Sequence, residues 1–207
     1  MLRVPYVISG SGKTVPEDTG TYPKSALVTT DTEIESQSMV DYLCSCGHKR
    51  IAFITSGDEG LGRCHLNGYK RSLEKNGLEY DEKLIIRLKP GKRIYTIENG
   101  YNCTCELLKS GVDFSCIYAI SDTLAVGACR AVIDSGKRVP EDYCVAGADG
   151  QDIAEYYHPS ITTLKYPRVE IALQSVRTLF DLINRKKVVK RQILGGTLIE
   201  RESTRKL

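Results

Sequence analysis

The sequence contains no tryptophan, three histidines and two methionines among its 207 residues. Neither a C-x-x-C pair nor an H-x-x-x-H pair is present, so the ligand spacing typical of a zinc site is missing. The sequence also lacks the G-x-S-x-G element of serine hydrolases and the phosphate-cradling G-x-x-x-x-G-K loop. With no activated nucleophile, metal set or paired acid and base, we expect no enzyme, no metal and no cofactor.

Long apolar runs are missing as well. No stretch approaches the roughly 18 consecutive apolar residues of a membrane span, and no charged start leads into an apolar run with a cleavage site. We therefore expect a cytoplasmic protein that does not enter a membrane.

An excess of one charge is also missing. The 29 basic and 26 acidic residues are interspersed and leave a formal charge of +3, so no sustained electrostatic field is directed at nucleic acid. The densest basic stretch, residues 185–187 with Lys190 and Arg191, is interpreted as a solvated turn rather than a phosphate contact.

Cysteine is the one unusually frequent residue type. The eight cysteines are spread over a chain long enough to form an ordinary core, and they are Cys44, Cys46, Cys64, Cys103, Cys105, Cys116, Cys129 and Cys144. The two C-x-C pairs fall in stretches that we expect to be helical, where positions i and i+2 point to different faces. Reduced and mostly buried thiols are the better interpretation.

From residue 49 onward, short apolar runs alternate with amphipathic stretches, which predicts βα units and a doubly wound parallel sheet. The predicted strands are 51–54, 84–86, 116–119 and 143–147, and the predicted helices are 63–76, 96–110 and 122–135, the last capped by Asp122. In the flanks we expect strands at 4–8, 25–28, 161–164 and 192–198, helices at 34–46 and 169–184, and a loop at 10–22.

Six blocks of sequence resemble the effector-binding part of LacI/GalR transcriptional regulators, in the same order and with similar spacing. The blocks are Gly47–Ile54 (GHKRIAFI), Leu66–Leu73, Ser121–Ala128, Arg138–Asp149, Pro159–Leu164 and Leu198–Ser203. One such block would be weak evidence, whereas six in register identify the chain as similar to this family.

The resemblance implies an α/β fold of the periplasmic-binding-protein-like I type, with two lobes built on doubly wound parallel sheets. It assigns residues 1–47 and 161–190 to an N-terminal lobe, and residues 48–160 and 191–207 to a C-terminal effector-binding lobe. On this division the C-terminal lobe is complete and the N-terminal lobe is partial. It would lack its first three strands and two helices, and the helix-turn-helix headpiece would be absent.

The effector site is expected beyond the carboxyl ends of the strands. Asp149 follows such a strand and matches the family aspartate that accepts hydrogen bonds from sugar hydroxyls; the alternative role is a helix N-cap. Tyr95 matches the family aromatic that packs under the ligand. His65 stands where the family usually has a ligand-binding arginine, with Arg63 close by, and it would titrate near pH ~6.5 unless its neighbours move it.

Three further candidates depart from the family pattern. Ser121 and Thr123 keep hydroxyls but shorten the reach of the usual polar contacts, and Tyr166, with Arg168, replaces the usual residues of the return crossover. Asp31 matches a family aspartate, but Glu33 and Glu35 follow where the pattern differs, so we assign Asp31 chiefly to helix capping.

The resemblance also implies a homodimer. We expect its interface to include the apolar side chains of the 122–135 helix and a nearby tyrosine pair, namely Val126, Cys129, Ile133, Tyr156 and Tyr157.

The predicted function is the ligand-sensing domain of a LacI-type regulator that binds a small effector, a sugar or a related compound, and thereby controls DNA affinity. Operator DNA would be contacted through the absent headpiece alone. Two alternatives remain open: a sugar-binding protein of a transport system, which shares the fold, and the same sensor joined to a different DNA-binding headpiece.

Overall fold

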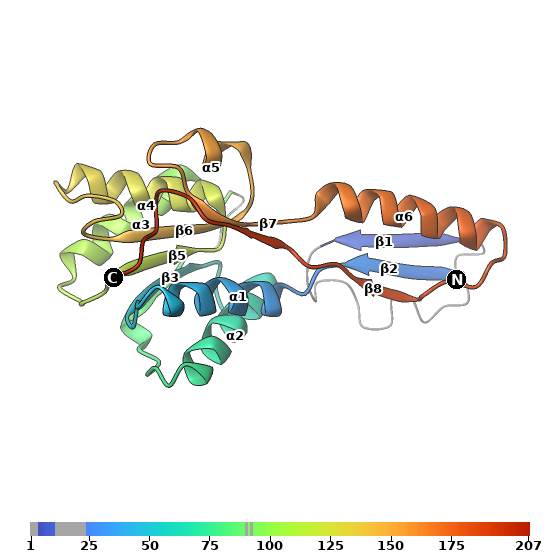
Figure 1. Ribbon diagram of the computed structural model, residues 1–207, viewed down its shortest axis with the longest axis horizontal. Coiled ribbons are helices and arrows are strands. Elements are labelled where there is room, and N and C mark those ends of the chain that lie inside the picture. The colour runs from blue at the N-terminus through green and yellow to red at the C-terminus, as the bar shows by residue number, and fades with distance from the viewer. Residues whose placement is uncertain (1–3, 11–23, 90, 92) are drawn as a thin grey trace.

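The computed structural model describes residues 4–10, 24–89, 91 and 93–207, which form two sheets of unequal size (Figure 1). The larger sheet has the strand order β4-β3-β5-β6-β7-β9. Its strands are β3 (Ile51–Thr55), β4 (Ile85–Arg87), β5 (Cys116–Ala119), β6 (Cys144–Asp149), β7 (Thr162–Lys165) and β9 (Thr197–Ile199). All neighbouring pairs are parallel except β7 with β9. The expected doubly wound α/β layer is thus confirmed.

Two pairs of helices cover the two faces of this sheet (Figure 1). Helices α1 (Thr32–Ser45) and α2 (Gly60–Lys75) pack together on one face, and α3 (Ile97–Lys109) and α4 (Asp122–Asp134) pack together on the other. A 3-10 turn, η2 (Glu82–Leu84), precedes β4, and the short α5 (Asp152–Tyr156) follows β6. Because both faces are covered, every residue of β3 and β5 is buried.

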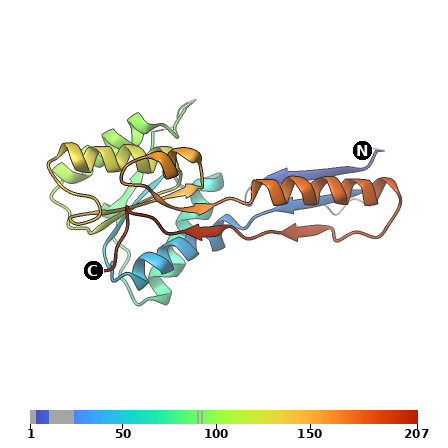
Figure 2. The ribbon, with the colours of Figure 1, turned by 45° about the horizontal axis from the view of Figure 1, so that its top comes forward.

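The smaller sheet projects away from this body (Figures 1 and 2). It has the order β1-β2-β8, with β1 (Tyr6–Gly10), β2 (Ser25–Thr29) and β8 (Arg191–Ile193) all parallel. Helix α6 (Arg168–Ile183) packs against β1 and β2. Most of the expected 10–22 loop lies outside the described residues.

The elements are divided between the two bodies differently from the division expected from the sequence. Helix α1 packs on α2 and β7 pairs with β6, so both belong to the larger body. The expected strand 192–198 is two strands, since β8 joins the smaller sheet and β9 the larger. The chain therefore crosses between the bodies after β2, after β7 and after β8.

The starts of α1, α3 and α4 are set by side-chain caps. Asp31 Oδ1 accepts hydrogen bonds from the backbone N–H groups of Glu33 and Ile34 at the start of α1, as expected. At α4 the prediction was wrong: the cap is Ser121, whose Oγ accepts from Leu124 N at 3.4 Å. Asp122 instead turns inward and accepts from Gln151 N and Thr163 Oγ1, each at 2.6 Å.

Helices α3 and α4 approach so closely that their backbones touch. A Cβ atom added at Gly127 would lie 2.0 Å from the carbonyl oxygen of Ile97, and one added at Gly100 would lie 2.1 Å from that of Leu124. Each glycine therefore makes room for the other helix, which explains the glycine near the end of the Ser121–Ala128 block.

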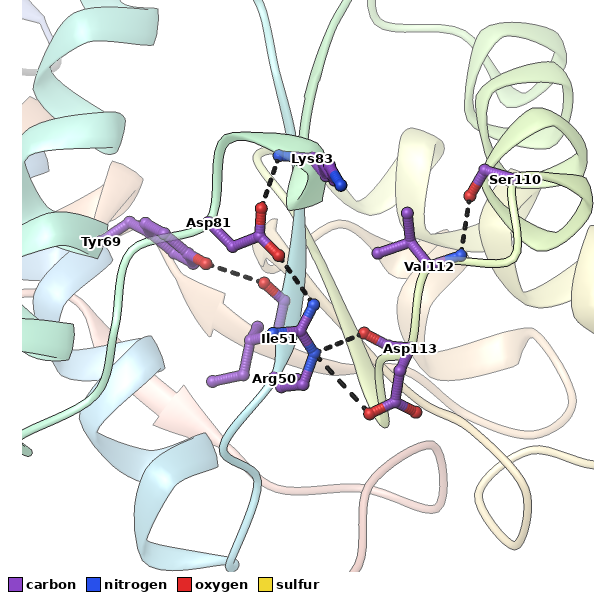
Figure 3. Close-up of polar contacts among 8 residues, drawn as sticks. All are labelled: Arg50, Ile51, Tyr69, Asp81, Lys83, Ser110, Val112 and Asp113. Carbon is purple, nitrogen blue, oxygen red and sulfur yellow. Dashed lines mark hydrogen bonds and ion pairs between the residues drawn. The ribbon is translucent and has the colours of Figure 1, made fainter.

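The Gly47–Ile54 block has a structural role at the amino end of β3 (Figure 3). Arg50 Nη2 donates to Asp81 Oδ2 at 2.8 Å, and Arg50 Nε donates to the carbonyl oxygen of Asp113 at 2.7 Å. Tyr69 OH donates to the carbonyl oxygen of Ile51 at 2.8 Å. These contacts connect the loops before β4 and β5, and helix α2, to the start of β3.

Helix α6 is apolar on two sides. Ile171 and Leu182 are buried, while a row of exposed side chains lies at alternating spacings of four and three residues, which keeps it on one face. This α6 row consists of Val169, Leu173, Val176, Phe180 and Ile183, each more than half exposed. Nothing in the described part of the chain covers the row.

Two of the expected dimer residues are core residues. Val126 is 3% exposed and Cys129 is fully buried, so neither side chain is available to a second subunit. The core takes both because α4 is buried against the sheet and against α3. Ile133 and Tyr156 are exposed and Tyr157 is half-buried, so these three remain candidates.

We expect the smaller sheet to open before the larger one. The main hydrophobic core consists of residues between Met39 and Leu164, and no residue of β1, β2 or β8 belongs to it. Backbone amides of β1 and β2 should therefore exchange with solvent deuterium faster than those of β3 and β5. Peptide-resolved hydrogen exchange measures this, and equal protection of the two sheets would contradict the prediction.

Candidate functional site

A pocket lies at the carboxyl ends of β5, β6 and β7, between the starts of α1 and α2. This is the edge at which parallel sheets bind ligands. The described residues that line it are Thr32, Glu35, Leu61, His65, Tyr95, Tyr118, Ile120, Ser121, Ala148, Asp149, Leu164 and Tyr166. Five of the seven residues predicted from the sequence are therefore brought together.

Asp149 is the last residue of β6 and has φ of +99°, a strained value for a residue with a side chain. Its Oδ2 accepts a hydrogen bond from Gln151 Nε2 at 3.1 Å. Burial raises the pKa of this carboxyl above its usual range. Asp149 does not cap α5, because the backbone N–H of Gln151 donates to Asp122 instead.

Glu35 enters the pocket from the first turn of α1. Its Oε2 accepts a hydrogen bond from Thr30 Oγ1 at 3.1 Å, whereas the buried Oε1 has no side-chain partner, and the backbone N–H of Gly196 is the one further group that favours the ionised carboxylate. Burial, together with the neighbouring Asp31 and Asp149 charges, raises the pKa of Glu35 to about 7 against the opposing effect of the hydrogen bonds from Thr30 and the Gly196 backbone. Thr32 is 3% exposed and its Oγ1 also has no partner. Unpaired polar atoms in a pocket are the groups that a ligand would satisfy.

His65 lines the pocket from α2. Its Nδ1 is buried and has no partner, and burial lowers the pKa of the ring to about 4. His65 is consequently uncharged at neutral pH, and its titration falls well below the expected range near 6.5. A neutral imidazole can donate with one nitrogen and accept with the other.

Two tyrosines frame the opening. Tyr95 is 44% exposed and presents an aromatic ring to the pocket. Tyr166 follows β7, and its hydroxyl donates to the carbonyl oxygen of Gly10 at 2.7 Å, which joins the larger body to β1. The guanidinium of Arg168 lies 5.8 Å from the centre of the Tyr166 ring.

Two predicted residues do not line the pocket. Arg63 is exposed on α2. Thr123 Oγ1 donates to the carbonyl oxygen of Tyr95 at 3.2 Å, so it supports a residue of the pocket rather than forming its wall. Ser121 lines the pocket, but its hydroxyl also caps α4.

Sequence reasoning missed Glu35 and Thr32 as pocket residues. Acidic residues are common in the first turn of a helix, so Glu35 resembled an ordinary partner of the helix dipole. The available signal was its position shortly after β2, which ends at Thr29, together with the departure from the family pattern there. The apolar wall, Leu61, Ile120, Ala148 and Leu164, was likewise not anticipated.

The pocket is acidic. Its described lining includes two carboxylates and one neutral histidine, and no lysine or arginine. No group of three or more histidine, cysteine or acidic side chains that could hold a metal ion occurs in the described part of the chain. The helices described here include none long and apolar enough to cross a membrane.

Comparison with known proteins places this geometry in a family. Residues 40–204 match the model of the periplasmic binding protein-like domain. The HTH-type transcriptional regulator MalR of Clostridium butyricum is 41% identical over 146 residues, which are 70% of this chain and 42% of that protein. The regulator CelR of Thermobifida fusca is 32% identical over 97% of this chain and 56% of that protein. The chain thus spans about half the length of these curated relatives.

Solved structures agree. The structure titled transcriptional regulator CelR-cellobiose complex superposes with a TM-score of 0.81 at 32% identity, covering 97% of this chain and 59% of that one. The expected two-lobe fold is therefore confirmed, and the relatives are transcriptional regulators rather than enzymes. The chain belongs to the periplasmic binding protein-like domain family, and it is similar to the corresponding part of HTH-type and LacI-family transcriptional regulators.

Proposed function

We propose that this chain binds a small polyhydroxylated ligand, a sugar or a glycoside, in the pocket around Asp149. The observation that carries the proposal is the set of buried polar atoms without partners on Thr32, Glu35 and His65, which converge on the pocket. Sugars match such a set because each hydroxyl donates and accepts hydrogen bonds. The aromatic ring of Tyr95 suits the apolar face of a pyranose.

The likeness to the CelR–cellobiose complex supports a sugar as the ligand class. A ligand other than cellobiose is expected for this chain, because several pocket residues depart from the family pattern. Ser121 and Tyr166 are among them, and Glu35 is another.

We further propose that ligand binding changes the DNA affinity of the regulator to which this domain belongs. Three chain crossings and the Tyr166–Gly10 hydrogen bond join the two bodies at the edge of the pocket. A ligand held there has a higher affinity for the chain in one relative orientation of the two bodies than in another. Binding therefore shifts the population toward the favoured orientation, by an amount set by that difference in affinity. Operator contact would be made by a helix-turn-helix segment of the kind for which MalR and CelR are called HTH-type regulators.

Replacing Asp149 by alanine should weaken sugar binding roughly ten- to hundredfold, because ligand hydroxyls would lose a charged acceptor in a partly dry site. A panel of neutral and amino mono- and disaccharides, screened by thermal unfolding followed by circular dichroism, supplies the ligand, and calorimetric titration measures its affinity. Asp152→Asn, which alters an exposed carboxylate three residues along the chain, is the control. If Asp149→Ala binds like the parent chain, the proposed site is wrong.

A homodimer is part of the proposal, with Ile133 and Tyr156 as exposed apolar side chains near the end of α4 and on α5. If they lie in the interface, Ile133→Lys places a charge where water is excluded and should shift the chain toward monomer. Sedimentation velocity at several concentrations measures the shift. An unchanged dimer would point to another surface, such as the α6 row.

A further inference from the structure

We propose that the ligand carries a protonated amine beside its hydroxyls, and that Glu35 and Asp149 together are the acceptors of that amine. The inference rests on the proposed sugar-binding function and names the chemical class of ligand more closely. Its basis is the convergence of two carboxylates, one from α1 and one from β6, on one pocket whose described lining contains no cationic side chain.

The charged and titratable groups that face Glu35 come from every element around it. Asp31 precedes it on its own helix, Asp149 faces it from β6, Tyr118 from β5 and Tyr166 from the segment after β7. His65 lines the pocket from α2 and is uncharged at neutral pH. None of these groups carries a positive charge at neutral pH.

Nearby cations are engaged elsewhere or act on the other carboxylate. Arg71 pairs with Glu33, the residue two before Glu35. Arg168 lies beside the ring of Tyr166 and lowers the pKa of Asp149 in opposition to burial. Glu35 Oε1 is therefore a buried acceptor that no side chain of the described residues satisfies.

A buried carboxylate without a counter-ion is costly, and a ligand can remove that cost by supplying the cation. An ammonium group has three donors and no acceptor, so it suits two carboxylates better than a hydroxyl does. Phosphorylated or acidic ligands would instead be repelled from this pocket by the same two groups.

The titration of Glu35 determines in which direction ligand affinity should change with pH. Free Glu35 has a raised pKa of about 7, so it is partly protonated near neutral pH. An ammonium favours the ionised carboxylate, so binding of an amine should release a proton and tighten as the pH rises from 6 to 7. A neutral sugar that accepts a hydrogen bond from protonated Glu35 should show the opposite trend.

The test uses matched sugar pairs: glucosamine with glucose, galactosamine with galactose, and mannosamine with mannose. Calorimetric titration at pH 6 and 7, in two buffers of different ionisation enthalpy, measures affinity and proton release. For at least one pair, the amino sugar should bind about tenfold more tightly than its neutral counterpart. That preference should vanish in Glu35→Gln and persist in Glu74→Gln, which alters an exposed carboxylate on α2.

The other outcomes separate this inference from the proposed function. Neutral sugars that bind as tightly as their amino counterparts, with affinity that depends on Asp149, would overturn the inference and leave the function standing. The same holds if the preference survives in Glu35→Gln, or if none of the three amino sugars binds while another neutral sugar does. If no sugar of either kind binds, both proposals fail.

Discussion

Gly127→Ala is expected to lower the free energy of unfolding by about 3 kcal/mol, the upper part of the range for overpacked cores. The new Cβ atom would lie 2.0 Å from the carbonyl oxygen of Ile97 and 2.7 Å from Tyr101 N. Both are backbone atoms of α3, so no flexible side chain can move aside and the two helices must separate. Because α3 and α4 cover one face of the larger sheet, their separation loosens the core.

Urea denaturation followed by circular dichroism measures this loss. Gly195→Ala is the matched control, since a Cβ atom added there would meet nothing within 4 Å. Gly100→Ala should resemble Gly127→Ala, because it places a Cβ atom 2.1 Å from the carbonyl oxygen of Leu124 in the same contact. A Gly127→Ala variant as stable as Gly195→Ala would show that the helices are not held at this distance.

Glu35→Gln is expected to stabilise the chain more at pH 8 than at pH 4. The difference in the free energy of unfolding between variant and parent should be about 2 to 3 kcal/mol more favourable to the variant at pH 8. The pKa of Glu35 is raised from 4.5 to about 7 in the folded chain. The unfolded state therefore binds fewer protons than the folded state between these values, and stability falls as the pH rises through that window. The glutamine variant does not titrate, so it removes this loss.

Denaturant unfolding at pH 4, 6 and 8 measures the effect. Glu74→Gln, which alters an exposed residue of α2, should leave the pH profile of the parent chain unchanged. Other groups contribute to that profile: the raised pKa values of Asp122, about 6, and of Asp149 act in the same direction as Glu35, and the lowered pKa of His65, about 4, and those of ion-paired carboxyls such as Asp142 act in the opposite direction. The comparison is therefore made between variant and parent at each pH, and an equal difference at pH 4 and pH 8 would contradict the assignment.

Most elements of the fold could be predicted from the sequence because the larger sheet is covered on both faces. Its central strands are short, continuous apolar runs, and capping residues and glycines mark the ends of the helices between them. What could not be predicted is which sheet each flanking strand joins. β8 and β9 fall in the stretch that the sequence predicts as a single strand, and they are separated by Leu194, Gly195 and Gly196; their partners β2 and β7 are more than 30 residues away in the chain.

The candidate site could be predicted where the resemblance supplied a position, as at Asp149, Tyr95 and His65. Their environments could not be predicted, because burial depends on the packed neighbours. The lowered pKa of His65 is an example, since nothing within a few residues of it in sequence indicates that Nδ1 is enclosed. Glu35 was missed for the same reason: its role depends on the path from β2 into α1, which brings the first helical turn beneath the carboxyl end of β6.

The exposed row on α6 affects how the protein can be observed. Environment-sensitive dyes report unfolding by binding newly exposed apolar surface, but Val169, Leu173, Val176, Phe180 and Ile183 already offer such surface in the folded chain. Dye fluorescence should therefore start high and rise little on heating, and a ligand could change it without changing stability. The chain also has no tryptophan and twelve tyrosines, and three of these, Tyr95, Tyr118 and Tyr166, line the pocket. Tyrosine emission is thus the built-in optical signal, and part of it comes from the binding site itself.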